Sequence, residues 1–525
     1  MNRLAGAALL ALVAGATFLT GLGAYPLLDP DEARHAEVAR EMAAGHGVRA
    51  LLLPTLELQP YREKPAGFYW LATLAYAALG VTEAAARLPS ALAALATVLA
   101  VYWWAAPRYG VPGALAAALV LATSAGWYGL ARFVNVDMTL TACIAFGVLS
   151  GLAWLEHPGG RRAPLAPWIA AGLGTTIKGP IALVLVLGPL ALAWAIGRPR
   201  PRVRDLRLAS GLATSLAIAA LLYVPVAILD ESYVRHFAGT NVARLGAGAP
   251  HASPAWYYFA WLPALLLPWT LFAPAAAAGA ARDPRSRVLL AWALFVPVVL
   301  TLAHGKLATY ALSALVPLAL LIGPPLAGAA IGAADLAGER ALRIAGWLAS
   351  GVLAAGGVGI VVAAQYFPIG TAAATLVTAT MLVAAAALAW TTLRRRAGLV
   401  PAVALAAVLV LYPALVHVVA PAVARVQSDR DAAALITAAG SAPVLAFSAL
   451  APSLVFYLRA PVVWTEDARL VRDLFARDEP VFLVTGRRHF ARIEELLGQR
   501  AHVWHATRRR RLYANRPAPA DGGPP

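Results

Sequence analysis

Residues 198–229 read RPRPRVRDLRLASGLATSLAIAALLYVPVAIL, an arginine-rich stretch that runs directly into an apolar one. The apolar half, 208–229, contains no charged residue. A helix needs about 20 mostly apolar residues to cross the hydrocarbon core of a bilayer. Lysine and arginine are enriched in the cytoplasmic loops beside such helices. The stretch therefore predicts a transmembrane helix that begins at the cytoplasmic face of a membrane.

The same pattern of basic loops and apolar runs recurs along the first 420 residues of the 525-residue chain. Hydrophobic residues make up 60% of the sequence and charged residues only 13%, well below the share on a soluble surface. The net charge of +17 would suggest nucleic acid in a soluble chain, but the arginines are grouped between apolar runs. These groups are Arg161–Arg162, 198–207, 282–287, Arg340 with Arg343, and Arg394–Arg396. They predict a multi-pass membrane protein with no nucleic-acid partner.

Counting from these cytoplasmic loops gives an all-α membrane domain over residues 1–424 with about 13 transmembrane helices. The helices are expected near 4–25, 88–106, 111–130, 137–155, 166–177, 180–197, 208–229, 256–278, 288–303, 310–328, 344–364, 372–391 and 398–419. The first run shows no convincing cleavage site and is predicted to remain as a span. This order puts the N-terminus in the cytoplasm and the chain after residue 420 outside. The stretch 65–80 would reverse every later loop if it crossed the membrane, so 27–87 is predicted as one external loop with interfacial or re-entrant helices.

The last hundred residues change in character and predict a second domain. Short β-rich runs alternate with helical stretches such as 491–499; the runs lie at 443–448, 460–466 and 480–486. We therefore expect a small α/β domain over 425–510 on the outer face, followed by a Pro- and Gly-rich disordered tail, 511–525. The stretch 508–525 also predicts a last strand that leads into this tail. The single cysteine, Cys143, excludes an intrachain disulfide framework.

Only three lysines occur in the chain, Lys64, Lys178 and Lys306. On the predicted topology all three fall on the outer side, against the positive-inside bias, together with the polar segments 29–42 and 131–140. Lysine, arginine and tyrosine can bind a phosphate or pyrophosphate, while a carboxylate can act as a general base or hold a metal ion. This set predicts group transfer from a lipid-linked phosphate donor at the outer surface of the membrane.

Simpler interpretations stay open for several of these residues. Asp31 and Glu32 could be the first-turn acids of an interfacial helix, where they would satisfy backbone N–H groups. Asp137 could cap the start of its span. Glu63 and Lys64 could form a surface ion pair, which contributes little to stability.

The polar motifs on the outer side resemble those of a known family. They are DPDEARHAEVAREM (29–42), YREKPAGFYW (61–70), AARLPSALAAL (85–95), ARFVNVDMTL (131–140), TTIKGP (175–180) and HGKLATYALSALVPLALL (304–321). In this order they resemble the bacterial aminoarabinose-lipid A transferases and, more distantly, the protein O-mannosyltransferases. Both are GT-C fold glycosyltransferases that use polyprenyl-phosphate sugar donors. The resemblance covers essentially the whole membrane domain and extends to the small C-terminal domain.

The resemblance implies roles for individual residues. Asp31 takes the place of the catalytic carboxylate that orients or deprotonates the acceptor. Glu63 is implied as a second catalytic carboxylate that helps to hold a divalent metal ion. Apart from the resemblance, His251 is a further candidate ligand by its residue type, and a solvated loop residue is its simpler interpretation. The lipid phosphate is expected on Lys64, Lys178, Arg244 and Tyr310, and the cavity is expected to include Glu32, Arg34, Asp137 and Lys306. Asn241 stands where acids and histidine are expected, so metal-assisted and metal-independent transfer both stay open.

We therefore expect a glycosyltransferase of the bacterial inner membrane that moves a sugar from a polyprenyl phosphate to a lipid or envelope-glycan acceptor, such as lipid A, on the periplasmic face. Its partners would be the donor lipid, the acceptor and the membrane lipids. A protein O-glycosyltransferase is the alternative within the enzyme class. A polyprenyl-lipid transporter is the non-enzyme alternative. A transporter would need polar groups in both leaflets, whereas here they lie on one side only.

Overall fold

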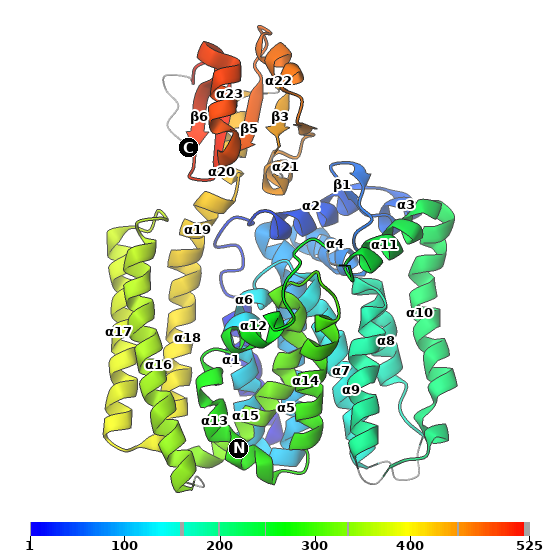
Figure 1. Ribbon diagram of the computed structural model, residues 1–525, viewed down its shortest axis with the longest axis vertical. Helices are drawn as coiled ribbons and strands as arrows, with labels where there is room; N and C mark the ends of the chain where they lie inside the picture. Colours follow the sequence, from blue (N-terminus) through cyan, green and yellow to red (C-terminus); the bar gives the residue numbers. More distant parts are fainter. Residues whose placement is uncertain are drawn as a thin grey trace.

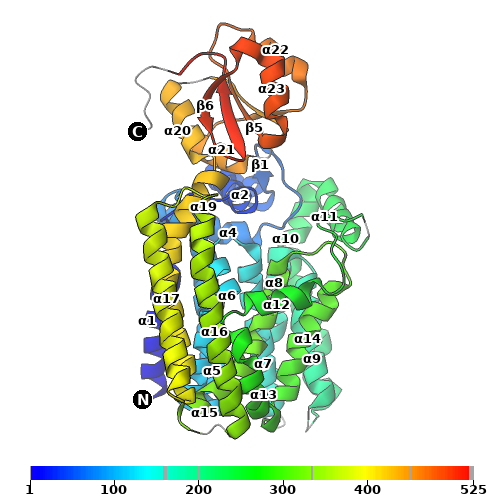
Figure 2. The same cartoon turned by 60° about the vertical axis from the view of Figure 1, so that its left-hand side comes forward.

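The computed structural model describes residues 2–157, 162–197, 200–246, 248–332, 335–440, 442–448 and 451–518. Long helices stand side by side in a bundle, and a small domain of C-terminal residues sits on one end of it (Figure 1). The N-terminus lies at the opposite end of the bundle (Figures 1 and 2). The molecule is therefore an all-helical bundle that carries an α/β domain, as its apolar and β-rich runs predict.

The apolar runs form long helices because a helix satisfies its own backbone polar groups without water. Those helices are α1 (Arg3–Leu19), α5 (Glu83–Ala122), α7 (Val136–Glu156), α8 (Ala166–Lys178), α9 (Ile181–Ile196), α10 (Leu208–Leu229), α14 (Ser286–Thr301), α15 (Leu315–Ala330), α16 (Leu336–Ala363), α17 (Thr371–Leu393) and α18 (Val400–Ala414). In the described part of the chain, seven helical segments are long and apolar enough to span a membrane. An eighth candidate is a pair of helices, Tyr257–Leu265 with Trp269–Ala277, bent by 96°. Each predicted span coincides with a helical segment, while the count of 13 stays a prediction.

Two predicted spans, 88–106 and 111–130, share the helix α5. At Gly110 the backbone has φ 68° and ψ 175°, which is not helical, so α5 divides there into two halves. Glycine adopts positive φ without the penalty that a side chain would bring. The second predicted span then continues into α6 (Ala125–Ala131).

The segment predicted as an external loop forms a layer across the end of the bundle. It contains α2 (Asp31–Ala44), α3 (Gly47–Leu52), the hairpin of β1 (Thr55–Leu56) and β2 (Gln59–Pro60), and α4 (Gly67–Leu79). Figure 1 shows α2 lying crosswise beneath the C-terminal domain. The Tyr76 hydroxyl on α4 donates to the Ala36 carbonyl on α2 (3.1 Å), which ties the two helices together.

A fully buried ion pair fixes this layer to the bundle. Arg87 of α5 and Glu32 of α2 both have 0% side-chain exposure, with Nε–Oε1 at 2.7 Å and Nη2–Oε2 at 3.0 Å. Arg87 Nη1 also donates to the carbonyls of Leu22 and Tyr25, at 2.6 and 2.9 Å. The oxygens of Glu32 accept the backbone N–H groups of residues 28 and 134 as well. Because a buried charge needs partners, this pair determines how α2 meets the bundle.

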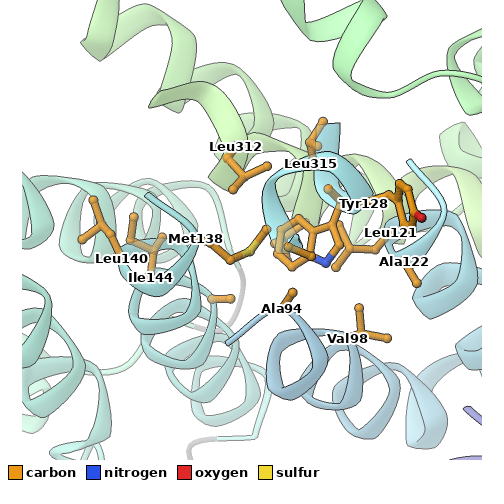
Figure 3. Packing of buried hydrophobic residues seen from close by; sticks show 14 of the residues in the cluster. Ala94, Val98, Leu121, Ala122, Tyr128, Met138, Leu140, Ile144, Leu312 and Leu315 are labelled. Atoms are coloured by element: carbon orange, nitrogen blue, oxygen red, sulfur yellow. The ribbon is translucent and has the colours of Figure 1, made fainter. Parts of the chain in front are cut away.

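Small and branched apolar side chains fill the centre of the bundle beneath this layer. Ala94 and Val98 of α5, Met138 of α7 and Leu312 all belong to this buried cluster (Figure 3). Successive helical residues point in different directions. Because Met138 is held in the core, its neighbour Asp137 faces a different side of α7, toward the cavity described below.

The C-terminal domain contains a five-stranded sheet in the order β4-β3-β5-β7-β6. Its elements are α20 (Arg430–Ala439), β3 (Val444–Phe447), α21 (Pro452–Leu458), β4 (Val463–Thr465), α22 (Ala468–Phe475), β5 (Phe482–Gly486), α23 (Phe490–Leu497), β6 (His502–Ala506) and β7 (Arg510–Ala514). Strands β4, β3 and β5 are parallel, while β7 is antiparallel to both β5 and β6. The three β-rich runs predicted from the sequence are β3, β4 and β5.

The predicted end of the domain at residue 510 needs correction. β7 spans Arg510–Ala514 and pairs on both sides, with β5 and with β6. β7 is the last strand expected within 508–525. Its backbone hydrogen bonds make it an interior strand, so the ordered domain extends beyond residue 510. Residues 519–525 of that tail lie outside the described residues.

The C-terminal domain joins the first external loop through a buried charged junction. Asp29, just before α2, accepts hydrogen bonds from the backbone N–H and the hydroxyl of Ser453 at the start of α21, at 2.8 and 2.5 Å. Arg510 of β7 pairs with Asp29 (2.6 Å) and also with Asp429. The C-terminal domain therefore contacts the first external loop at Asp29, two residues before Asp31.

Candidate phosphate-binding site

A cavity of about 330 Å³ lies between helices of the bundle and the loops that follow them. Its polar lining comes from α7, α8, the end of α11 (Glu231–Ala243), the loop after it, α12 (Tyr257–Leu265) and the 3-10 helix η3 (Ala308–Ala314): Asp137, Thr141, Lys178, Asn241, Arg244, Tyr258 and Tyr310. The rest of the wall is mostly apolar and includes Leu140, Ile144, Ile181, Val184 and Leu185. One cavity thus combines cations and hydroxyls with an apolar surface.

At the centre of the cavity, Lys178 is held by three neighbours. Its ammonium group pairs with Asp137 Oδ1 and lies 3.6 Å from the centre of the Tyr310 ring. Thr309 Oγ1 donates to the other Asp137 oxygen at 2.8 Å. The last residue of α8 therefore points its charge at the first turn of α7. Two roles were open for Asp137, a helix cap or a cavity residue. The structure shows it in the cavity lining, paired with Lys178.

Lys64 approaches the same cations from the first external loop. A Cβ atom at Gly67 would lie 2.5 Å from the Thr176 carbonyl, so only glycine lets the start of α4 pack this closely against α8. The Tyr233 hydroxyl donates to the Lys64 carbonyl at 2.8 Å, which fixes the loop from the other side. This packing brings Lys64 near the end of α8.

The charge of Lys64 is opposed by its surroundings. Burial, followed by the nearby cations Arg244 and Lys178, lowers the pKa of Lys64 to about 7, although Glu63 and Asp137 act in the other direction. An amine among cations favours an anionic partner, since a bound anion would stabilise its protonated form.

Arg244 enters the cavity from the loop after α11. Its carbonyl accepts the backbone N–H groups of His304 and Gly305, at 3.0 and 3.1 Å. This links the loop to the motif that carries Tyr310. The four residues predicted to bind a lipid phosphate thus converge, Lys178, Arg244 and Tyr310 in the cavity lining and Lys64 beside them.

The two predicted catalytic carboxylates lie nearer the solvent. Asp31, at the start of α2, has a side-chain exposure of 58% and pairs with Arg34 at 3.4 Å. Glu63 is exposed as well. Burial raises the pKa of Tyr61, and the charges of Glu63 and Asp31 act in the same direction, so both carboxylates lie around this one residue. They are accessible to an acceptor, although neither lines the cavity.

Arg34, which was expected in the cavity, does not line it and pairs with Asp31 at 3.4 Å. Two further residues expected in the cavity have other partners. Glu32 is fully buried against Arg87, because both its oxygens serve the junction between α2 and α5. The Lys306 ammonium group donates to the Ser253 carbonyl at 2.9 Å and so secures the loop before α12. Both predictions are corrected: these side chains hold the scaffold around the cavity.

The residues present do not fit a metal ion at the predicted ligands. Among the described residues no group of three or more His, Cys, Asp or Glu side chains comes together in a way that could hold a metal ion. Glu63 is exposed, and His251 lies in the loop that Lys306 secures, with its carbonyl accepting the Lys306 N–H. We therefore derive no step that uses a metal.

His35 is a residue of this region that the motif comparison did not single out. Its Nδ1 lies 2.8 Å from the Tyr69 hydroxyl. Burial, with Lys64 and Arg34 nearby, lowers the pKa of His35 to about 3, so its ring is neutral. His35 is four residues after Asp31, a spacing that places both on one face of a helix and could have revealed it from the sequence.

Known proteins resemble this chain in sequence and in structure. The profile of the dolichyl-phosphate-mannose-protein mannosyltransferase family matches residues 63–229. An undecaprenyl phosphate-alpha-4-amino-4-deoxy-L-arabinose arabinosyl transferase of Pectobacterium atrosepticum is 31% identical over 373 residues, which cover 67% of this chain and 65% of the relative. A protein of the same description from Pseudomonas aeruginosa is 32% identical over 345 residues, 62% of this chain and 60% of the relative. The chain thus spans slightly less than two thirds of these curated relatives.

The fold is shared over almost the whole chain. The crystal structure of ArnT from Cupriavidus metallidurans bound to undecaprenyl phosphate matches with a TM-score of 0.78, at 21% identity and over 97% of both chains. The apo structure of the same protein matches with a TM-score of 0.75. The chain is a multi-pass membrane protein with the GT-C fold, and the resemblance to aminoarabinose-lipid A transferases expected from its motifs is confirmed.

Proposed function

We propose that this protein is a membrane glycosyltransferase that moves a sugar from a polyprenyl-phosphate donor to a lipid or envelope-glycan acceptor. The observation that carries the proposal is the convergence of Lys64, Lys178, Arg244 and Tyr310 around a cavity with apolar walls. Cations suit a phosphate and apolar walls suit a polyprenyl chain. The relatives named above are arabinosyl transferases that use undecaprenyl phosphate, which supports the same class of donor here.

The cations would act on the leaving group. The acceptor oxygen forms a bond to the anomeric carbon of the sugar while the bond from that carbon to the phosphate oxygen breaks. The phosphate leaves with the electron pair, and Lys178, Arg244 and Lys64 stabilise the negative charge that develops on it. Asp137 and Thr309 hold Lys178 in place for this step.

Asp31 would act on the acceptor. If the acceptor is a hydroxyl group, its proton passes to the Asp31 carboxylate as the new bond forms. If the acceptor is a phosphate group it is already anionic, and Asp31 chiefly orients it. The exposure of Asp31 supports a role toward an acceptor that arrives from outside the bundle. We place this reaction on the periplasmic face of the inner membrane, with the N-terminus in the cytoplasm.

The first test measures binding of undecaprenyl phosphate to the purified protein. We expect Lys64→Ala and Lys178→Ala each to lose about tenfold or more in affinity, which corresponds to about 1.4 kcal/mol. Arg235→Ala is the matched control, because Arg235 is an exposed cation on the neighbouring helix α11. Equal affinity in all variants would show that these lysines do not bind the lipid phosphate.

A second test separates transfer from donor binding. We expect Asp31→Asn to lower transfer by about a hundredfold or more, since general acid–base groups contribute about 10²–10⁴-fold, while undecaprenyl phosphate still binds. Product formation from a polyprenyl-phosphate sugar is the readout. Full transfer by Asp31→Asn would exclude it as the catalytic carboxylate, and a transporter would form no product in any variant.

A further inference from the structure

A group of exposed arginines lies on the edge of the C-terminal sheet that faces the helical bundle. Arg487 and Arg488 follow β5, and Arg508 and Arg509 form the turn between β6 and β7. Because β5 and β7 are antiparallel neighbours, the end of β5 and the start of β7 lie at the same edge. The Arg487 N–H donates to the Arg509 carbonyl at 2.9 Å, which joins the two loops. We call these four residues the arginine edge.

Two contacts place the arginine edge at the height where the helices leave the membrane. The guanidinium group of Arg508 donates to the Gln365 carbonyl at 2.8 Å and lies 5.2 Å from the ring centre of Tyr366. Gln365 and Tyr366 form the connection between α16 and α17, which are both long and apolar enough to span a membrane. Figures 1 and 2 show the C-terminal domain on the end of the bundle where α16 and α17 are connected.

Within the described part of the chain, no acidic side chain neutralises the positive charge of the edge. All four side chains are exposed, and no carboxylate among the described residues pairs with any of them. The two acids at this edge, Asp29 and Asp429, are both bound by Arg510. The positive-inside bias disfavours arginine on the outer side of a membrane, so a cluster here calls for an anionic partner.

We propose that the arginine edge binds the phosphate groups of anionic phospholipids at the outer surface of the membrane. Guanidinium groups match phosphate oxygens in a two-pronged geometry, and basic clusters beside a bilayer gain affinity from anionic lipids. The location favours bilayer lipids over the sugar acceptor: Figure 1 shows α16 and α17 on the opposite side of the bundle from α8 and α9, which line the cavity. The inference rests on the proposed outward orientation of this face but not on the proposed transferase activity.

The test compares two variants of the full-length protein that carry the same change in net charge. The edge variant combines Arg487→Gln, Arg488→Gln and Arg509→Gln. The control variant combines Arg472→Gln, Arg477→Gln and Arg500→Gln, three exposed residues elsewhere on the same domain. Native mass spectrometry measures the affinity of each detergent-purified protein for anionic phosphatidylglycerol and zwitterionic phosphatidylcholine. Hydrogen exchange of the β6–β7 turn in wild-type protein, in nanodiscs with and without phosphatidylglycerol, is a second readout that needs no variant.

We expect the wild type and the control variant to prefer phosphatidylglycerol, and the edge variant to lose about tenfold in that affinity. The turn should exchange more slowly when phosphatidylglycerol is present. Equal losses in both variants would reduce the effect to net charge and overturn the proposal, as would an unchanged edge variant with an unprotected turn. Binding of a phosphorylated glycolipid at the edge without any preference for phosphatidylglycerol would make it an acceptor site and also overturn the proposal.

Discussion

The ammonium group of Lys64 lies where burial and two neighbouring cations oppose its charge, so its pKa is lowered to about 7. An anionic phosphate binds the protonated amine. We therefore expect the affinity for undecaprenyl phosphate to fall as the pH rises through 7, by up to about tenfold per pH unit above it. A titration of the dissociation constant between pH 6 and 9 measures this.

Lys64→Arg is the control for this prediction, because arginine stays charged over the whole range. The lipid phosphate gains negative charge as the pH rises, which acts in the opposite direction but equally in both proteins. The difference between their titration curves therefore isolates Lys64. Parallel curves would show that Lys64 does not change its charge in this range.

Residue types and motif spacing predicted most of the cations that gather at the cavity, but they did not predict where every side chain points. The contrast of three lysines with many arginines pointed to Lys64 and Lys178, which the structure places beside one another. Lys306 belongs to the same motif as Tyr310, yet its amine points to a loop carbonyl. The rotation of Glu32 toward Arg87 depends on packing between two helices far apart in the sequence, which no local pattern contains.

At the scale of elements, the buried pair of Glu32 on α2 and Arg87 on α5 predicts a large effect on stability. Arg87→Met would leave the Glu32 charge buried without its partner, which costs about 3–5 kcal/mol. We expect a clear drop in the thermal stability of the detergent-purified protein. Adding Glu32→Gln should recover part of it, because glutamine is neutral and its side-chain oxygen can still accept backbone N–H groups.

The matched control is the pair of Arg62 and Asp230, whose side chains are 28% and 15% exposed. Water reaches this pair, so Arg62→Met should cost much less than Arg87→Met. If the double variant is no more stable than Arg87→Met alone, the uncompensated charge is not the reason for the loss.

Apolar runs predicted the helices well because a span is defined by its length and by the absence of charge. The run 208–229 is α10 with the same bounds. Interruptions within helices were harder to predict. The bend between Leu265 and Trp269 breaks one predicted span into two short helices, and Pro263 lies within the first of them. Prolines also occur within α9 and α10, so a proline by itself does not predict such a break.

For the whole molecule, the sequence indicated two domains but not how they meet. Asp29, Asp429 and Arg510 are far apart in the chain, and only the assembled fold shows that one arginine serves both acids. Because Asp29 lies two residues before Asp31, the C-terminal domain takes part in placing the proposed catalytic carboxylate. A domain that looked separable in the sequence is thus connected to the layer of the first external loop, which carries Asp31.

This connection predicts that Arg510→Ala lowers transfer without lowering donor affinity. The donor cations lie on the bundle and its loops, whereas Asp31 depends on the junction, and a small displacement of a reacting group costs about tenfold to a hundredfold in rate. Arg511→Ala is the control, because the neighbouring Arg511 pairs with Glu494 inside the C-terminal domain. Transfer rate, undecaprenyl phosphate affinity and hydrogen exchange around Ser453 are measured for both. Loss of donor affinity in Arg510→Ala would indicate a general disruption, and equal rates in both variants would show that the junction does not position Asp31.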